Sequence, residues 1–263
     1  MDVTPTKPRR GIYLLPNLFT TGALFAGFYA IIAAISGFYT DAVVSIFIAG
    51  VLDGLDGRVA RLTNTQSEFG VQYDSLSDLV SFGVAPALVL YLWSLASLKE
   101  YGTAWGKLGW AAAFIFAACG ALRLARFNTQ VGVADKRYFQ GLAIPAAAGL
   151  AMSYLWAVDD LGLTGANVRF ITPVVAIVAG LLMVSRFRYF SFKTWPRSDR
   201  VPFAWILVVV LILVALAINP ARMLFAIAAL YALSGPVLTL WGLRQRRARH
   251  GQPPPPAGEN PQP

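Results

Sequence analysis

Four aspartates, Asp53, Asp56, Asp74 and Asp78, lie within a stretch of 26 positions that is otherwise largely apolar. Carboxylates are costly inside a membrane segment unless they pair or serve a function, and four like charges repel one another unless cations neutralise them. Hard divalent ions such as Mg²⁺ or Mn²⁺ take carboxylate oxygens as ligands and commonly bridge them to phosphate. Two such ions about 4 Å apart stabilise the attacking and leaving oxygens of a phosphoryl transfer. The aspartates therefore indicate metal-assisted phosphoryl chemistry.

The residues that follow Asp53 fit this chemistry if the stretch is helical. A helix places Asp56, Gly57, Ala60 and Arg61 at about −60°, +40°, −20° and +80° from Asp53. Two carboxylates, two very small residues and one guanidinium then share a stripe. The small residues would let a nucleotide base or pyrophosphate approach the backbone, and the arginine offers a fork of donors for phosphate.

A second stripe follows on the next helix, where Gly70, Asp74 and Asp78 recur every four residues. The short turn TNTQSE joins the two helices, so the stripes can face each other. A single aspartate or small residue at such a place often only pairs with arginine or packs helices. The whole set at this spacing favours a functional site.

Composition defines the class of protein. Hydrophobic residues make up 57% of the chain and charged residues only 13%, with a mean hydropathy of +0.58, whereas average soluble proteins carry about 25% charged residues. This indicates an integral membrane protein and argues against nucleic acid as the partner of the basic residues. Cys119 is the single cysteine and His250 the single histidine. A His- or Cys-ligated metal is therefore excluded, and any metal must be held by oxygen.

The apolar runs predict an all-α integral membrane protein with about eight transmembrane helices, because about 20 residues cross a bilayer. The runs are too long and continuous for membrane strands, so strands are not expected. Pro145 and Pro173 interrupt the fifth and sixth runs and soften their limits. The expected spans are 14–36, 40–62, 71–95, 107–127, 141–158, 167–185, 201–218 and 221–243.

Charge predicts the orientation. If the N-terminus is cytoplasmic and the spans alternate, 22 basic residues divide so that only four lie outside: Lys99, Lys107, Arg169 and Arg222. This asymmetry follows the positive-inside rule and places both termini in the cytoplasm and the aspartates near the inner face, where the net charge of +9 meets anionic lipids. The expected organisation is a cytoplasmic segment 1–13, a transmembrane domain 14–243 and a tail 244–263 that is basic and then Pro-rich and disordered.

The aspartate segment resembles a known family. Asp53-x-x-Asp56-Gly57-x-x-Ala60-Arg61, eight further residues, and Gly70-x-x-x-Asp74-x-x-x-Asp78 match the signature of the CDP-alcohol phosphatidyltransferases at every position. Members of this family transfer a phosphatidyl or related phosphoryl group from a CDP-linked lipid to an alcohol and release CMP.

The resemblance implies a role for each matching residue. It implies that Asp53, Asp56 and Asp74 bind two divalent cations, Mg²⁺ or Mn²⁺, and that Asp78 contacts metal and is the general base. Gly57, Arg61 and Ser67 match nucleotide-binding positions. Asn17 and Thr20, near the cytoplasmic start of the first span, could reach the cytidine or its phosphates, although ordinary helix capping explains them equally well. The full set of expected CDP-lipid-binding residues is Gly57, Ala60, Arg61, Ser67, Gly70, Asn17 and Thr20.

Four further stretches are similar to bacterial CDP-diacylglycerol–serine phosphatidyltransferases: RRGIYLLPNLFTTGALFAGFYA, LRLARFNTQ, YFQGLAIPAAAG and SRFRYFSFK. This similarity implies CDP-diacylglycerol and L-serine as substrates and the bacterial inner membrane as the location, with the active site at the cytoplasmic face. A bidentate arginine would suit the carboxylate of serine, whereas each basic residue alone could simply contact lipid head groups. The candidates are Arg123, Arg126, Asn128, Lys136, Gln140 and Arg188.

Other functions remain open at this point. A family member that uses glycerol 3-phosphate, inositol phosphate or choline would keep the aspartate signature and change the acceptor pocket. A cation transporter could use the four carboxylates as its ion site, but their clustering near one face argues against transport. The apolar spans 201–218 and 221–243 could also support a homodimer in the lipid membrane.

Overall fold

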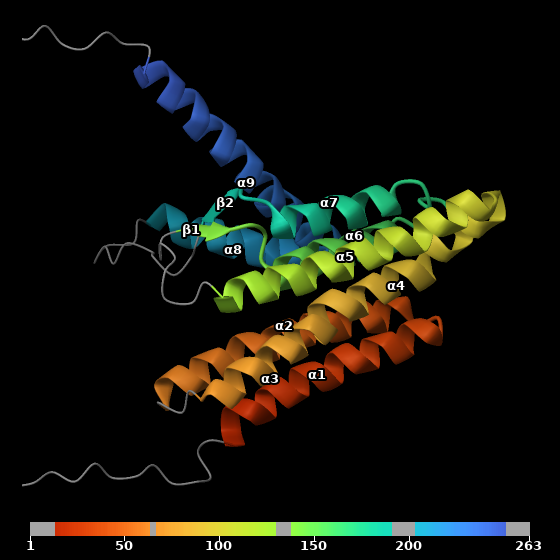
Figure 1. Ribbon diagram of the computed structural model, residues 1–263, viewed down its shortest axis with the longest axis horizontal. Coiled ribbons are helices and arrows are strands. Elements are labelled where there is room, and N and C mark those ends of the chain that lie inside the picture. Colours follow the sequence, from red (N-terminus) through yellow and green to blue (C-terminus); the bar gives the residue numbers. More distant parts are fainter. Residues whose placement is uncertain (1–13, 64–66, 130–137, 191–202, 251–263) are drawn as a thin grey trace, which may run out of the picture.

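The computed structural model describes residues 14–63, 67–129, 138–190 and 203–250. Most of its helices run along one common direction (Figure 1). The elements in chain order are α1 (Leu14–Ile35), α2 (Tyr39–Leu62), α3 (Glu68–Asp78), the π-helical turn η1 (Leu79–Val84), α4 (Ala85–Trp93), the 3₁₀ segment η2 (Leu95–Tyr101), α5 (Thr103–Thr129), β1 (Tyr138–Gln140), α6 (Ile144–Asp160), α7 (Thr172–Val184), β2 (Arg188–Phe190), α8 (Phe203–Ile218) and α9 (Pro220–His250).

The expected helical architecture is confirmed for the described residues, and each expected span coincides with a helix or with the continuous α3–η1–α4 unit. Within the described residues, four helical segments are long and apolar enough to cross a membrane: Pro16–Ile35, Glu68–Trp93, Thr103–Thr129 and Pro220–Thr239. Two shorter apolar helices cover Thr172–Val184 and Ile206–Ile218. The count of eight spans and their orientation stay predictions.

Two prolines begin helices instead of interrupting them. Pro145 and Pro173 lie in the first turn of α6 and α7, where the fixed φ of proline suits the helix and its missing N–H leaves no bond unmade. A third proline, Pro86, is the second residue of α4, which follows η1. It cannot donate to the carbonyl four residues earlier, and in η1 the N–H of Ala85 bonds instead to the carbonyl of Val80, five residues back.

The expectation that the chain contains no strands is wrong for two short segments. β1 and β2 pair antiparallel, with Phe139 opposite Tyr189 and Gln140 opposite Arg188. Gly141 ends β1 with a φ of 79°, which glycine adopts without strain. Strands of three residues are too short to interrupt a hydropathy pattern, so the apolar runs gave no sign of them.

α1 packs closely against both α2 and the α3–η1 unit. The α1–α2 contact is lined by buried alanines, which let two helix backbones approach each other. Ser77 and Ser81 donate from their hydroxyls to the carbonyls of Thr20 and Ala23, at 3.1 and 3.0 Å. These bonds fix the end of α3 against α1.

The C-terminal helices differ from the rest in burial. Every side chain of α8 from Ile206 to Val214 is exposed, and α8 packs against α9. α9 continues to His250, so the basic part of the expected tail, residues 244–250, is helical. Segments 1–13 and 251–263, which belong to the expected terminal regions, lie outside the described residues.

Candidate active site

The four aspartates gather where α2 and α3 meet. Carboxylate oxygens of Asp53, Asp56 and Asp74 all lie within 4.8 Å of one another. The carboxyl group of Asp78 completes the cluster through a side-chain hydrogen bond with Asp53. The i, i+3 spacing on α2 and the i, i+4 spacing on α3 place each pair on one helix face. The structure thus brings together the four residues that the sequence singled out.

α1 supplies the support for this cluster. The hydroxyl of Thr20 donates to Oδ2 of Asp56 at 2.7 Å and also lies 3.1 Å from the carbonyl of Pro16. Thr20 is 4% exposed, so its side chain orients a carboxylate instead of facing a solvent-filled pocket. The hydroxyls of Thr21 and Tyr73 lie 2.9 Å apart and join α1 to α3 one turn away.

Three of the expected nucleotide-binding residues lie close together near the start of α3. Ser67 and Gly70 belong to this segment, and Asn17 belongs to α1. Ser67 caps the helix, accepting a hydrogen bond from the N–H of Gly70 at 3.0 Å. A Cβ added at Gly70 would lie 3.2 Å from Oγ of Ser67 and 3.6 Å from Oδ1 of Asn17. Asn17, Ser67 and Gly70 therefore form one small polar group, in which the Ser67 hydroxyl serves as a helix cap.

Three more of the expected CDP-lipid-binding residues lie on α2. Gly57 is exposed, and a Cβ added there would meet nothing within 4 Å. Ala60 is partly buried one turn further on. The exposed Arg61 donates from Nε to the carbonyl of Gly57 at 2.7 Å. The space above Gly57 is therefore open, and no packing contact in the described structure requires a glycine at this position.

The expected acceptor residues come from α5 and the β-ribbon. Arg126 donates from Nη2 to Oε1 of Gln140, which ties α5 to β1. Asn128 donates from Nδ2 to Oγ of Ser75 at 3.1 Å, which ties α5 to α3 next to Asp74. Lys136 lies outside the described residues, and Arg188 is described only as the residue opposite Gln140 in the ribbon.

Arg123 of α5 is a basic residue that interacts with the aspartate cluster. Its guanidinium interacts electrostatically with Asp78 on α3 and with Tyr231 on α9. Its Nε atom is buried without a hydrogen-bond partner among the described residues. A buried donor left unpaired costs about 1–3 kcal/mol, which indicates that a ligand completes its contacts. Tyr231 was not found by sequence reasoning, because a tyrosine in an apolar helix is usually core.

The donor set suits a divalent cation. Oδ1 of Asp74 is buried and has no hydrogen-bond partner among the described residues, and it belongs to the group of three converging carboxylates. An unpartnered carboxylate oxygen beside two others is the environment that a hard cation such as Mg²⁺ or Mn²⁺ neutralises. The residues present therefore fit the metal chemistry expected for them.

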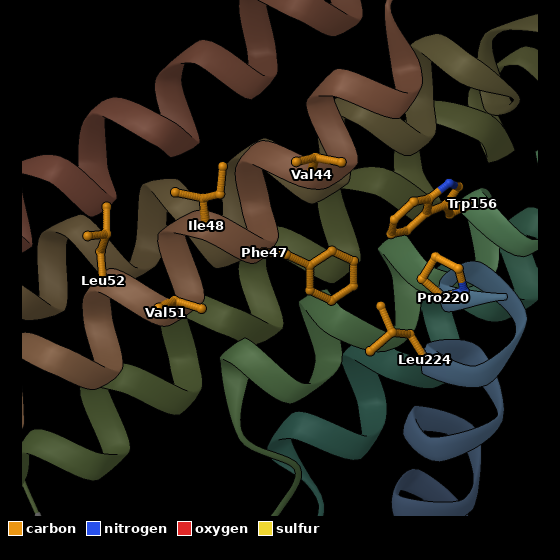
Figure 2. A pocket seen from close by; sticks show the side chains of 8 residues that line it. All are labelled: Val44, Phe47, Ile48, Val51, Leu52, Trp156, Pro220 and Leu224. Atoms are coloured by element: carbon orange, nitrogen blue, oxygen red, sulfur yellow. The ribbon is translucent and has the colours of Figure 1, made fainter. Parts of the chain in front are cut away.

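An apolar groove runs along α2 on a face that is turned away from Asp53 and Asp56. Five residues of α2 form one wall, and residues of α6 and α9 form the other (Figure 2). Its volume is about 470 Å³. The α2 wall ends at Leu52, directly before Asp53. The lining residues are Val44, Phe47, Ile48, Val51, Leu52, Trp156, Pro220 and Leu224.

Helical segments long enough to span a membrane and a converging set of carboxylates are typical of a membrane enzyme that uses divalent cations. The family model for CDP-alcohol phosphatidyltransferases matches residues 13–185. The chain belongs to this family, which confirms the resemblance drawn from the aspartate signature, and it is a transferase of phospholipid synthesis.

Three named relatives show which members of the family this chain is similar to. A CDP-diacylglycerol–serine O-phosphatidyltransferase of Helicobacter pylori is 40% identical over 186 residues, which cover 71% of this chain and 76% of the relative. The enzyme of the same name from Methanocaldococcus jannaschii is 38% identical over 189 residues, covering 72% and 80%. An archaetidylserine synthase of Methanothermobacter thermautotrophicus is 33% identical over 187 residues, covering 70% of each chain.

Proposed function

We propose that the protein transfers the phosphatidyl group of CDP-diacylglycerol to the hydroxyl of L-serine, forming phosphatidylserine and releasing CMP. The observation that carries this proposal is that Arg123, which interacts electrostatically with Asp78, has a buried Nε without a hydrogen-bond partner among the described residues. A cation at this place suits an acceptor that carries a carboxylate. The names of the relatives, which contain serine, support the same acceptor.

Asp53, Asp56, Asp74 and Asp78 would hold two divalent cations, Mg²⁺ or Mn²⁺. When bound, such cations neutralise the pyrophosphate of the CDP-lipid and the charge that develops on the departing CMP. Thr20 keeps Asp56 in place for this task through its 2.7 Å hydrogen bond. Outer-shell partners of this kind typically affect metal affinity 10–100-fold.

The chemical step follows from the position of Asp78 between the other aspartates and Arg123. The serine oxygen attacks the β-phosphorus, which carries diacylglycerol, and the bond from this phosphorus to the oxygen of the CMP phosphate breaks. Asp78 accepts the hydroxyl proton, and a positioned base contributes about 10²–10⁴-fold to the rate. Because the attack is direct, the configuration at phosphorus inverts, and retention would instead indicate a phosphatidyl-enzyme intermediate.

The lipid substrate enters from the side of α2. We place its phosphates beside Asp53 and Asp56, with its acyl chains left in the bilayer. The cytidine then lies over Gly57, Ala60 and Arg61 and toward the polar group formed by Asn17, Ser67 and Gly70. A soluble nucleotide such as CDP should compete with the lipid for this space.

The membrane arrangement that we propose has eight spans, cytoplasmic termini and an active site at the inner face of the bacterial cytoplasmic membrane. The start of α1, the end of α2, the start of α3, the C-terminal end of α5 and the β-ribbon all lie at one end of the molecule (Figure 1). In the expected orientation this end carries most of the basic residues. A second copy of the chain could cover the exposed side of α8.

The deciding experiment incubates purified protein in detergent with CDP-diacylglycerol, Mn²⁺ and labelled serine, with glycerol 3-phosphate, inositol phosphate and choline offered in parallel. We expect labelled phospholipid and stoichiometric CMP with serine alone. Product formation with another acceptor, and none with serine, would reassign the acceptor within the family.

A further inference from the structure

A second, polar hollow lies next to the apolar groove of α2. Figure 2 shows Trp156 and Pro220 at one end of this groove and Leu52 at the other. Near the Trp156 end, where α2 begins and α6 finishes, lies a smaller hollow of about 230 Å³, called the acidic hollow below. It is lined by Gly37, Phe38, Tyr39, Thr40, Asp41 and Asp159.

The groove and the acidic hollow adjoin on two helices. Asp41 precedes Val44 by three residues on α2, and Asp159 follows Trp156 by three residues on α6. Residues three apart are neighbours on a helix surface. The hydroxyl of Thr40 donates to Oδ2 of Asp159 at 3.3 Å, which joins the two helices at this point. The acidic hollow therefore opens about one helical turn beyond the apolar groove.

Both carboxylates of the acidic hollow are available to a cation. Asp41 and Asp159 are exposed, and neither forms an ion pair within the part of the chain that the structure describes. Asp41 lies in the first turn of α2, where the helix dipole favours a negative charge. Asp159 lies in the last turn of α6, where the dipole disfavours one. Its neighbour Asp160 is compensated by Arg222, whereas Asp159 lacks such a cation.

The groove has the dimensions of a hydrocarbon chain. From Val44 to Leu52 it follows α2 for about 12 Å, at a rise of 1.5 Å per residue. A helix with its side chains is about 10 Å wide, so 12 Å of helix would fill roughly twice the groove volume of about 470 Å³. The rings of Phe47 and Trp156, with 6.3 Å between their centroids, line the end nearest the acidic hollow. The volume therefore favours an acyl chain over a helix of a second copy.

We propose that the groove and the acidic hollow together bind one membrane phospholipid whose head group carries an ammonium. An acyl chain lies in the groove, and the ammonium lies between the carboxylates of Asp41 and Asp159. Phosphatidylethanolamine has this chemistry, whereas phosphatidylglycerol brings only negative charge to two carboxylates. The site is separate from the aspartate cluster, because Asp53 lies about 18 Å beyond Asp41 along α2. It therefore binds a lipid that is not a substrate, whichever acceptor the enzyme uses.

Trp156 allows this lipid to be detected, because bromine atoms on an acyl chain quench the fluorescence of a tryptophan that they touch. The full chain is reconstituted in bilayers with equal amounts of phosphatidylethanolamine and phosphatidylglycerol, and only one of the two is brominated. The signal of Trp156 is the difference between wild type and Trp156→Phe. Trp110, which is 55% exposed on α5, is measured in the same way with Trp110→Phe and reports lipid contact outside the groove.

We expect brominated phosphatidylethanolamine to be preferred over brominated phosphatidylglycerol roughly fivefold at Trp156, as for an exposed ion pair. Trp110 should be quenched equally by both lipids. Equal quenching of Trp156 by the two lipids in the wild type would overturn the proposal. Quenching of Trp110 without any quenching of Trp156 would also overturn it, because the groove would then be covered by protein, such as a second copy of the chain.

The carboxylates are tested with a variant that carries both Asp41→Asn and Asp159→Asn. The preference at Trp156 should disappear in this variant. Asp160→Asn removes a carboxylate at the same end of α6 but outside the acidic hollow, and it should keep the fivefold preference. Each single variant should lose part of the preference, which keeps the test decisive if the double variant does not fold. A preference that survives the loss of both carboxylates would contradict the assignment of the head group.

Discussion

Charged side chains are arranged differently at the two ends of the molecule. At the end where η2 and α6 finish, Arg169 pairs with Glu100 and Arg222 with Asp160, each at 2.7 Å. At the other end, four aspartates converge from α2 and α3, and Arg123 is the cation that faces them within the described structure. At the first end, these charged side chains pair with one another. At the second end, the carboxylates of the cluster are available to a cationic ligand.

Exposure explains why the difference is informative. The side chains of Glu100 and Arg222 are 63% and 53% exposed, and exposed ion pairs typically contribute only about 0–1 kcal/mol. The aspartates at the site are partly or fully buried, and like charges without counter-ions are costly there. The aspartate cluster lowers the stability of the folded chain, and we attribute its presence to the binding of a cationic ligand.

The largest effect should come from Asp74→Asn. We expect activity below about one-hundredth of wild type, since a metal ligand should matter more than the outer-shell partners that contribute 10–100-fold. The melting temperature should not fall, because the change relieves repulsion between carboxylates. Glu68→Gln, an acidic residue of the same helix outside the cluster, is the control. Near-normal turnover of Asp74→Asn at low Mn²⁺ would contradict the metal site.

Thr20→Val should weaken the site through Asp56. The variant keeps the shape of the side chain and removes the hydroxyl that donates to Oδ2 of Asp56. We expect the Mn²⁺ concentration for half-maximal activity to rise about 10–100-fold. Thr20→Ser retains the hydroxyl and should restore the wild-type value. Equal metal dependence in Thr20→Val and wild type would show that Asp56 does not need this support.

Gly57→Ala separates ligand access from helix stability. A Cβ meets nothing within 4 Å at Gly57 or at Gly54 one turn earlier, and alanine favours a helix over glycine by about 1 kcal/mol. Both variants should therefore melt no lower than wild type. Only Gly57→Ala should raise the KM for CDP-diacylglycerol, roughly tenfold, as expected for crowding in a fitted pocket. Identical kinetics of the two variants would remove Gly57 from the nucleotide site.

The smallest effect concerns pH at the paired end. A hydrogen bond from Asn219, with the nearby Arg222 guanidinium, lowers the pKa of Asp160 from its ordinary value. A lowered folded-state pKa contributes stability above the unfolded pKa of about 3.9, and this contribution is lost as pH falls. The melting-temperature difference between wild type and Asp160→Asn should therefore be small, constant above about pH 5, and vanish in acid. A difference that grows on acidification would contradict this assignment.

The sequence was sufficient for the features that are local along the chain. The length of the apolar runs predicted where the helices lie, and the spacing of the aspartates placed each pair on one helix face. It failed where non-local pairing or a single residue decides the outcome. The three-residue strands β1 and β2 pair with each other although α6 and α7 lie between them in the sequence. Pro145 and Pro173 start helices because of their position in the first turn.

By itself, the sequence determined that this is a helical membrane protein with four carboxylates at signature spacing, because helical periodicity and hydropathy are properties of adjacent residues. Only the tertiary structure decided that Thr20 orients Asp56 and that Arg123 faces Asp78. It alone placed Tyr231 of α9 against Tyr189 of β2, with 5.5 Å between the ring centroids. These contacts join helices far apart in the chain, and their geometry depends on how α1, α5 and α9 pack, which no local pattern specifies.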